Sequence, residues 1–269
     1  MLETPDGNAI VGYAGLGSTP RRIEPSDWMN AVLRGENRTL EAALGTLADA
    51  AREQIPQMLI KAPGANPLGH AFVIPAFLNE TPAFYCIEMA VHGDRQHCTF
   101  RFVRQVVRTT PNGRLVPPRI IAAGSGMSLI AQRPLRLRTL RHLIRAHDRK
   151  AISTMAVADH LASISYCVHQ SDPLVGPRSI VAWHYRKRGL YGGGGGHQFY
   201  TGPQRDNRTE SLPTIANGMN VSGLVDLLMP VFEQSMKAML AGKPHPGIDK
   251  NEMDAIAARV PMKPDRNLR

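Results

Sequence analysis

Cysteine is scarce in this 269-residue sequence, where it occurs only at Cys86, Cys98 and Cys167 and never as a C-x-x-C pair. This spacing predicts neither a disulfide framework nor a cysteine-ligated metal centre. Cys86 and Cys98 could pair across a hairpin, although buried free thiols are the commoner state of such residues. Long apolar runs are also absent, because none approaches the roughly 18 residues that a membrane-spanning helix needs. We therefore expect no membrane segment and no fold held together by disulfides.

Aromatic residues are few as well, at 6% of the chain, and this bears on its excess of basic residues. Lys and Arg number 32 against 22 for Asp and Glu, so the net charge is +10, which would suit a nucleic-acid partner. The basic residues cluster only at 133–149 and 186–188, and the first cluster nearly lacks the interleaved aromatic side chains that stack on single-stranded bases. The pattern disfavours nucleic-acid binding and leaves it as a weak alternative.

The overall composition, 43% hydrophobic and 20% charged, is typical of a globular protein with a full core. Leu2–Asp6 is acidic and polar, unlike the basic and apolar regions of a signal peptide. We therefore expect a folded, cytoplasmic protein.

Two short apolar runs each end in glycines. Ala9–Tyr13 is followed by Gly15 and Gly17, and Arg119–Ala123 is followed by Gly124–Gly126, which reads Gly-Ser-Gly. Each run predicts a strand buried on both faces. A glycine at a strand end lets the backbone turn sharply or lie against a ligand. Together the runs predict one sheet with a site along one edge.

The periodicity along the chain predicts the order strand, two helices, strands, two helices, strands, helix. Runs of strands separated by runs of helices favour an α+β layered domain over alternating βαβ units. We predict one domain over 1–215 and a C-terminal helical extension with a basic tail over 216–269. The expected helices are 25–35, 39–55 ended by Pro56, 137–144, 153–168 and 222–242, and the expected further strands are 70–78, 83–91, 97–108, 179–186 and 197–201.

Three catalytic or binding motifs are incomplete. Gly12–Thr19 approaches a P-loop, but Ser18 replaces the lysine that would reach the phosphates. Ala123 and Met127 stand where the glycines of a G-x-S-x-G nucleophile elbow would be. The ten histidines form no H-E-x-x-H pattern. We therefore expect no cofactor and no metal.

Five consecutive glycines, Gly192–Gly196, are the most distinctive local feature without an assigned role. With Arg186–Arg188 upstream, their backbone amides could form an anion-binding loop. Such a run more often forms a flexible or closely approached loop.

The stretch Ile10–Gly17 resembles the strand and Ala-Gly turn of proteasome β-type subunits and their bacterial relatives, which are N-terminal-nucleophile (Ntn) hydrolases. Ile120–Gly126 is similar to the later strand of that family that ends in Gly-Ser-Gly. The helix pair at 26–55, the hairpin at 70–91 and the paired helices at 138–170 follow the family order. The resemblance covers about residues 8–190. It implies a four-layer α/β/β/α sandwich of Ntn-hydrolase type that lacks the first two strands and carries a helical C-terminal extension.

The resemblance also implies roles for individual residues. Family members use an amino-terminal Thr, Ser or Cys whose own α-amino group is the base. Gly15 would donate its N–H to the oxyanion, and Ser125 and Asp172 would support the amino terminus. The backbone that pairs with an extended substrate would be Ala14, Gly15, Leu16 and Gly17.

In the family, two strands before the Ala-Gly strand carry the nucleophile, an acidic residue and a lysine. Seven residues precede Asn8 here, and Thr4 is internal. We therefore expect amide-bond hydrolysis from a full-length form and no peptidase activity from residues 1–269. The alternatives are a non-catalytic scaffold or interaction subunit of a homo-oligomer and a basic nucleic-acid-binding protein. Family members form rings, so self-assembly is expected.

Overall fold

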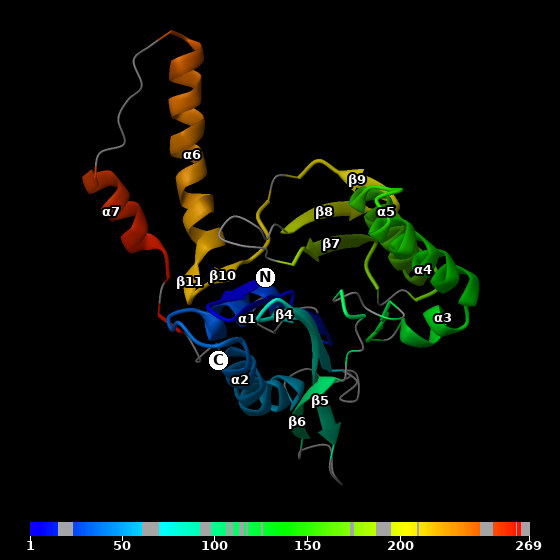
Figure 1. The fold of residues 1–269 in the computed structure, drawn as a ribbon. Coiled ribbons are helices and arrows are strands. Elements are labelled where there is room, and N and C mark those ends of the chain that lie inside the picture. The colour runs from blue at the N-terminus through cyan, green and yellow to red at the C-terminus, as the bar shows by residue number, and fades with distance from the viewer. Residues whose placement is uncertain are drawn as a thin grey trace.

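The computed structural model describes residues 1–15, 24–60, 70–91, 98–105, 107, 110–112, 116, 118–124, 126–172, 175–186, 195–208, 210–242, 250–261 and 263–264. These residues form a mixed α+β fold, as the sequence predicts, and their strands lie in two sheets (Figure 1). The larger sheet contains β1 (Leu2–Thr4), β2 (Gly7–Ala9), β3 (Gly12–Ala14), β4 (Ala71–Leu78), β5 (Thr81–Val91), β6 (Cys98–Gln105), β10 (Ile215–Ala216) and β11 (Met219–Asn220). The smaller contains β7 (Arg178–His184), β8 (Gly195–Thr201) and β9 (Gln204–Asp206). The helices are α1 (Pro25–Leu33), α2 (Leu40–Ile60), α3 (Met127–Ala131), α4 (Pro134–Asp148), α5 (Thr154–His169), α6 (Val221–Leu240) and α7 (Lys250–Arg259).

The larger sheet has the order β11-β10-β1-β2-β4-β5-β6, and β3 also pairs with β4. Only the β1–β10 pair is parallel; the other pairs in this sheet are antiparallel. The hairpin of β10 and β11 thus brings residues 215–220 beside the first strand of the chain. The predicted domain boundary at residue 215 falls inside this hairpin.

Strands β2 and β3 lie in one register on β4, since Ala9 is opposite Ala76 and Gly12 is opposite Val73. The ladder is interrupted between them, where Pro75 of β4 has no N–H to donate. The N–H of Ile10 still donates to the Pro75 carbonyl at 3.1 Å. The strand predicted over 9–13 is therefore two short strands.

This segment is not buried on both faces, contrary to the prediction. Ala9 is fully buried, and Val11 and Tyr13 pack against the main core. On the opposite face, Ile10 and Gly12 line a cleft. Val11 also reaches the cleft, so the period-two alternation of the strand separates core from cleft only in part.

Helices α1 and α2 pack on one face of the larger sheet and enclose the main core (Figure 1). Helix α1 begins with Pro25 in its first turn and ends before Gly35 (φ +96°), as predicted. The indole N–H of Trp28 donates to Gln54 Oε1 at 2.9 Å and joins the two helices. Trp28 also stacks near Phe72 of β4, with ring centroids 6.1 Å apart.

Helix α2 runs to Ile60, so the predicted end at Pro56 is wrong. Its first N–H, on Leu40, donates to Asp6 Oδ1 at 2.8 Å, so the turn between β1 and β2 caps this helix. A proline removes one backbone hydrogen bond from a helix. Ile55, directly before Pro56, is buried in the core, and this packing holds the helix through that turn.

The hairpin of β4 and β5 confirms the predicted strands at 70–78 and 83–91, with a tighter turn. Asn79 and Glu80 form it, with φ angles of +46° and +64°, the pair that a type I′ turn requires. Strand β6 lies within the predicted 97–108.

The second predicted glycine-ended strand is absent, because 118–123 form no strand in the described chain. Ile121 is 42% exposed, whereas a strand buried on both faces would hide it. Pro117 and Pro118 in the sequence supply no N–H for a ladder. The run is apolar because it borders the cleft, not because it lies inside a sheet.

The smaller sheet is covered by α5, and α4 packs along α5 (Figure 1). Helix α5 confirms the helix predicted over 153–168, and Ser153 caps it, since its Oγ accepts the Ala156 N–H at 3.3 Å. Tyr200 of β8 is fully buried against Ala158 and Ala162 of α5. The small residues on this face of α5 leave room for the tyrosine ring.

A cluster of polar side chains also joins α5 to the smaller sheet. The Tyr200 hydroxyl donates to Asp159 Oδ1 at 2.9 Å, and Arg205 donates to both carboxylate oxygens of Asp159 at 2.8 and 2.6 Å. The Arg205 hydrogen bonds hold the pKa of Asp159 below its usual range. Burial, with the Asp159 hydrogen bond, raises the pKa of Tyr200 to about 12.

The last two glycines of the run at 192–196 lie in β8, not in a loop. A Cβ at Gly196 would sit 2.5 Å from the Trp183 ring of β7, so only glycine fits under this indole. Gly192–Gly194 lie outside the described residues.

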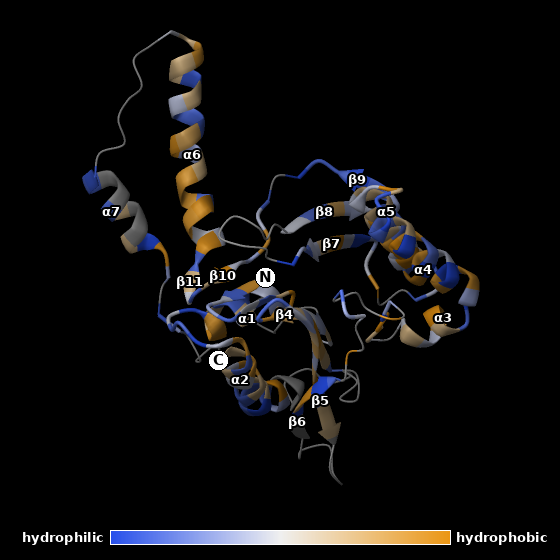
Figure 2. Cartoon of the chain, viewed as in Figure 1, coloured by the Kyte–Doolittle hydropathy of each residue, from blue (hydrophilic) through white to orange (hydrophobic). Residues whose placement is uncertain are grey.

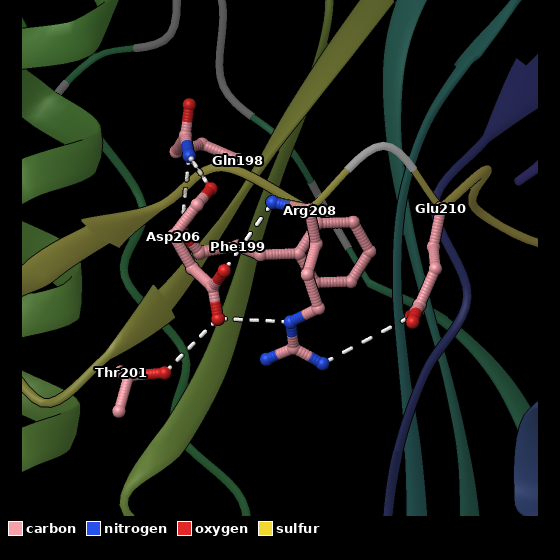
Figure 3. A network of polar contacts seen from close by, with 6 residues as sticks. All are labelled: Gln198, Phe199, Thr201, Asp206, Arg208 and Glu210. Atoms are coloured by element: carbon pink, nitrogen blue, oxygen red, sulfur yellow. Dashed lines mark hydrogen bonds and ion pairs between the residues drawn. The ribbon is translucent and has the colours of Figure 1, made fainter.

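A second polar network joins β8 and β9 to the segment that follows them (Figure 3). Asp206 Oδ2 accepts from Thr201 Oγ1 at 3.1 Å and from Arg208 Nε at 2.8 Å. The Arg208 guanidinium lies over the Phe199 ring, 5.2 Å from its centroid. The hydrogen bond from Arg208 lowers the pKa of Asp206. This network directs the chain from the smaller sheet back towards β10.

Helix α6 projects away from both sheets, and α7 lies beside it (Figure 1). Asn220 caps α6 by accepting the Gly223 N–H at 3.1 Å, and Gly242 (φ +68°) follows its end as predicted. Pro230 lies inside the helix. None of the helices in the described chain is long and apolar enough to cross a membrane.

Replacing Asp159 by Asn should weaken the contact between α5 and the smaller sheet. The folded-state pKa of Asp159 is lowered, so its contribution to the free energy of unfolding is present above the unfolded pKa of about 3.9 and is lost as pH falls through the folded value. Urea unfolding from pH 6 to pH 3 should therefore show a shallower acid loss in the variant. Asp254→Asn, on the exposed side of α7, is the control and should unfold like the wild type. Equal acid dependence in wild type and Asp159→Asn would contradict this role.

Candidate functional site

Gly15 follows β3 directly and lies against Tyr13 and His70. A Cβ at Gly15 would sit 2.4 Å from both His70 Nδ1 and Tyr13 Oη, so the backbone needs a glycine here. Tyr13 Oη and His70 Nδ1 are hydrogen-bonded at 2.7 Å. His70 is 3% exposed, and burial lowers its pKa, which favours the neutral imidazole. A neutral imidazole and a phenol thus support the backbone that the resemblance marks as an oxyanion donor.

The sequence reasoning missed His70 and Tyr13. The strand register places His70 at the site. Ala14 of β3 is opposite Ala71 of β4, so His70, one residue before Ala71, lies beside Gly15. This register cannot be read without knowing that β3 pairs with β4.

The two glycine-ended segments come together, although not as strands of one sheet. Gly124 (φ +93°) lies against Ala14, since a Cβ at Gly124 would be 3.4 Å from the Ala14 Cβ. Gly126 lies against α5, where a Cβ would be 2.4 Å from Val168 Cγ1. Ser125, between these two glycines, lies outside the described residues, as do Leu16 and Gly17.

Asp172 lies just after α5, close in the chain to the helix end that Gly126 contacts. Its N–H donates to the Val168 carbonyl at 2.8 Å, and its own carbonyl accepts the Val175 N–H at 3.1 Å. Asp172 and Gly126 therefore both contact Val168. Of the predicted site residues, the structure brings Ala14 and Gly15 to one side of Gly124 and Asp172 to the α5 side.

The outer edge of β3 carries no strand in the described part of the chain. β3 pairs with β4 alone, whereas β2 has β1 on one side and β4 on the other. In an antiparallel ladder, alternate residues direct their N–H and C=O groups away from the partner strand. An extended chain that docks beside β3 would lie along this side of the strand.

A cleft of about 640 Å³ lies between the two sheets. Ile10 and Gly12 form part of its wall on the larger sheet, Val181 forms part of it on β7, and Leu161 reaches it from α5. The lining is mainly apolar, which is typical of sites that bind small molecules or apolar side chains. Because alternate residues of a strand face one side, a chain added to β3 would direct alternate side chains towards this cleft.

Two residues that line the cleft each carry a buried polar atom without a hydrogen-bond partner among the described residues. These atoms are Asn30 Oδ1, from α1, and Ser179 Oγ, from β7. A buried polar atom without a partner costs on the order of 1–3 kcal/mol. Because both atoms are inaccessible, an occupant of the cleft would reach them only after these side chains move.

Other candidate groups contribute little to a site. In the described chain, no group of three or more His, Cys, Asp or Glu side chains could hold a metal ion. Register places Cys86 opposite Val103 and Cys98 opposite Val91, so the pairing considered for Cys86 and Cys98 is ruled out. Burial raises the pKa of the Cys86 thiol, so it is a poor nucleophile.

The comparisons with known proteins found no matching family model. They found no matching curated protein and no matching solved structure. Function must therefore be inferred from the β3 edge, the residues around Gly15 and the cleft.

Replacing Gly15 by Ala should destabilise the fold by about 1–3 kcal/mol, because the added Cβ collides with the Tyr13–His70 pair. Gly45→Ala in α2 is the matched control, since a Cβ there meets nothing within 4 Å. That change should stabilise the protein by up to about 1 kcal/mol through helix propensity. Chemical denaturation of both variants measures the difference. Equal stabilities would show that the backbone at Gly15 relaxes freely.

Replacing His70 by Gln should reduce the loss of stability between pH 7.5 and 5.5. The folded-state pKa of His70 is lowered by burial, so below the unfolded value of about 6.5 the unfolded chain binds a proton that the folded chain does not. The free energy of unfolding therefore falls as pH falls through that window. Burial also lowers the pKa of His184, so some slope should remain in the variant. His142→Gln, exposed on α4, is the control and should leave the slope unchanged.

Proposed function

We propose that this protein binds extended peptides or amides along β3 as a proteasome-like protein of the Ntn-hydrolase type, and that a full-length form hydrolyses the bound amide. The observation that carries the proposal is the apolar cleft beside β3, a strand that leads into Gly15, where the backbone lies against the Tyr13–His70 pair. An extended chain beside β3 would gain affinity from main-chain hydrogen bonds, and the cleft would select its side chains.

The arrangement of layers supports the finer fold proposal, a four-layer α/β/β/α sandwich. α1 and α2 cover one sheet, α5 and α4 lie outside the other, and residues of both sheets line the cleft (Figure 1). The absence of a strand over 118–123 in the described chain is a departure from the family pattern.

The groups around Gly15 suit the polarisation of an amide carbonyl. A backbone N–H that is held rigidly stabilises the negative charge that develops on a carbonyl oxygen. Tyr13 and His70 fill the space behind Gly15 and restrict its backbone. The nucleophile is not among the residues that the resemblance matches, so we expect residues 1–269 to bind an amide without turning it over.

A non-catalytic subunit of a homo-oligomer is the second candidate. The observation that favours it is the row of exposed apolar side chains on α6, a helix that contributes nothing to the cleft.

Binding of end-blocked extended peptides, measured by calorimetry or fluorescence anisotropy, tests the proposal. N-methylation of alternate peptide amides should weaken binding at least about tenfold in one register and little in the other, because only one set of amides faces β3. Mass spectrometry of the same mixtures should show intact peptide.

Gly12→Leu should also weaken binding, because the new side chain enters the cleft beside β3. Gly45→Leu, on α2 with open space around it, is the control and should bind as the wild type does. Binding that ignores N-methylation in both registers would rule out pairing with β3, and binding unchanged by Gly12→Leu would rule out the cleft.

A further inference from the structure

Helix α6 exposes a straight row of large apolar side chains. Val225, Met229, Phe232, Met236 and Met239 are between 38% and 57% exposed, even with α7 lying beside the helix. Figure 2 shows apolar residues along much of α6, and Figure 1 shows the helix projecting from the two sheets. We refer to these five residues as the α6 seam. Exposed apolar patches of this kind mark interaction surfaces.

The spacing of the residues in the α6 seam indicates that another helix packs against it. Successive seam residues are separated by four, three, four and three positions, which is the a/d pattern of a heptad. Leu240, which is 84% exposed, follows Met239 and lies outside this row. A row at a and d positions is narrower than the apolar face that a helix turns towards a globular core. Such a row packs side chains as knobs between those of one other helix running nearly alongside.

We infer that the α6 seam pairs with the α6 seam of a second copy of this chain, antiparallel and centred on Phe232. This inference does not depend on the proposed amide binding. Phe232 is midway between Val225 and Met239, so a two-fold axis there sets Phe232 against Phe232 of the second copy. The same axis sets Val225 against Met239, and Met229 beside Met236, of the second copy. Every seam residue then meets a seam residue, as a two-fold contact requires.

Charge supports the antiparallel direction. Asp226 falls beside Lys237 of the second copy, and symmetry makes this pair twice. The two Glu233 side chains come near each other, and each has Lys237 four residues along its own helix to offset this. A parallel pair would instead set Asp226 and Glu233 against Leu228, Ser235 and Gly242, with no opposite charge.

The charges next to the α6 seam disfavour a lipid surface. Helices that lie on anionic membranes carry Lys and Arg along the edges of the apolar face. The α6 seam is bordered by Asp226, Glu233 and a single basic residue, Lys237, so this border is acidic on balance.

Sedimentation velocity over a concentration series tests the pairing. The wild-type chain should form dimers. Met229→Glu combined with Phe232→Glu should raise the dimer dissociation constant at least about 100-fold, because charges would be buried at the centre of the contact. Gln234→Glu, exposed on the other side of α6, is the control and should leave the dimer unchanged. Circular dichroism and peptide binding should match the wild type in all variants, which separates this test from that of the β3 edge.

Single cysteines test the direction. Phe232→Cys should form a disulfide-linked dimer on mild oxidation, because the two copies of residue 232 meet. Val225→Cys should not, since its antiparallel partner is residue 239, whereas an equal mixture of Val225→Cys and Met239→Cys should crosslink. The parent chain, with its native cysteines, gives the background.

Three results would overturn the inference. They are a wild-type chain that stays monomeric to high concentration, a dimer that survives the double glutamate change, and efficient crosslinking of Val225→Cys alone. Binding of the wild-type chain to phosphatidylserine vesicles that the double change abolishes, without any dimer in solution, would assign the α6 seam to lipid instead.

Discussion

Strand β4 holds the larger sheet together, because it pairs with β2 and β3 on one side and with β5 on the other. Its core face, with Phe72 and Ile74, meets α1 and α2. Pro75 interrupts the ladder without ending it, since the Ile10 N–H still reaches the Pro75 carbonyl. The position of β3, and with it that of Gly15, depends on this pairing.

The location of the candidate site at β3 depends on which strands of the larger sheet pair with each other. β1 pairs with β2 but not with β3, so in the described chain no strand lies on the side of β3 away from β4. Antiparallel register then places His70 beside Gly15, in a space that only a glycine leaves open. The proposed binding site beside β3 and the α6 seam occupy different parts of the molecule, so the proposed self-association would leave the cleft accessible.

Local signals in the sequence predicted the elements well where short-range physics dominates. Pro25 and Gly35 set the ends of α1, Ser153 begins α5, and Asn79 and Glu80 lie in the turn expected between β4 and β5. Local signals gave wrong predictions where contacts with residues distant in the sequence determine the structure. Pro56 does not end α2, because core packing of Ile55 outweighs the lost hydrogen bond. The apolar run at 119–123 is not a strand, because apolar character alone provides no partner for a ladder.

By itself, the sequence determined the mixed α+β class, the ends of α1, α5 and α6, and the β4–β5 hairpin. These depend on contacts within a few residues, such as caps, turns and side-chain period. Only the tertiary structure decided that Gly124 lies against Ala14, that His70 and Tyr13 support Gly15, and that β8 takes in two glycines under Trp183. Each is a contact between segments that lie apart in the chain. Such contacts depend on strand register and helix packing, which no local pattern specifies.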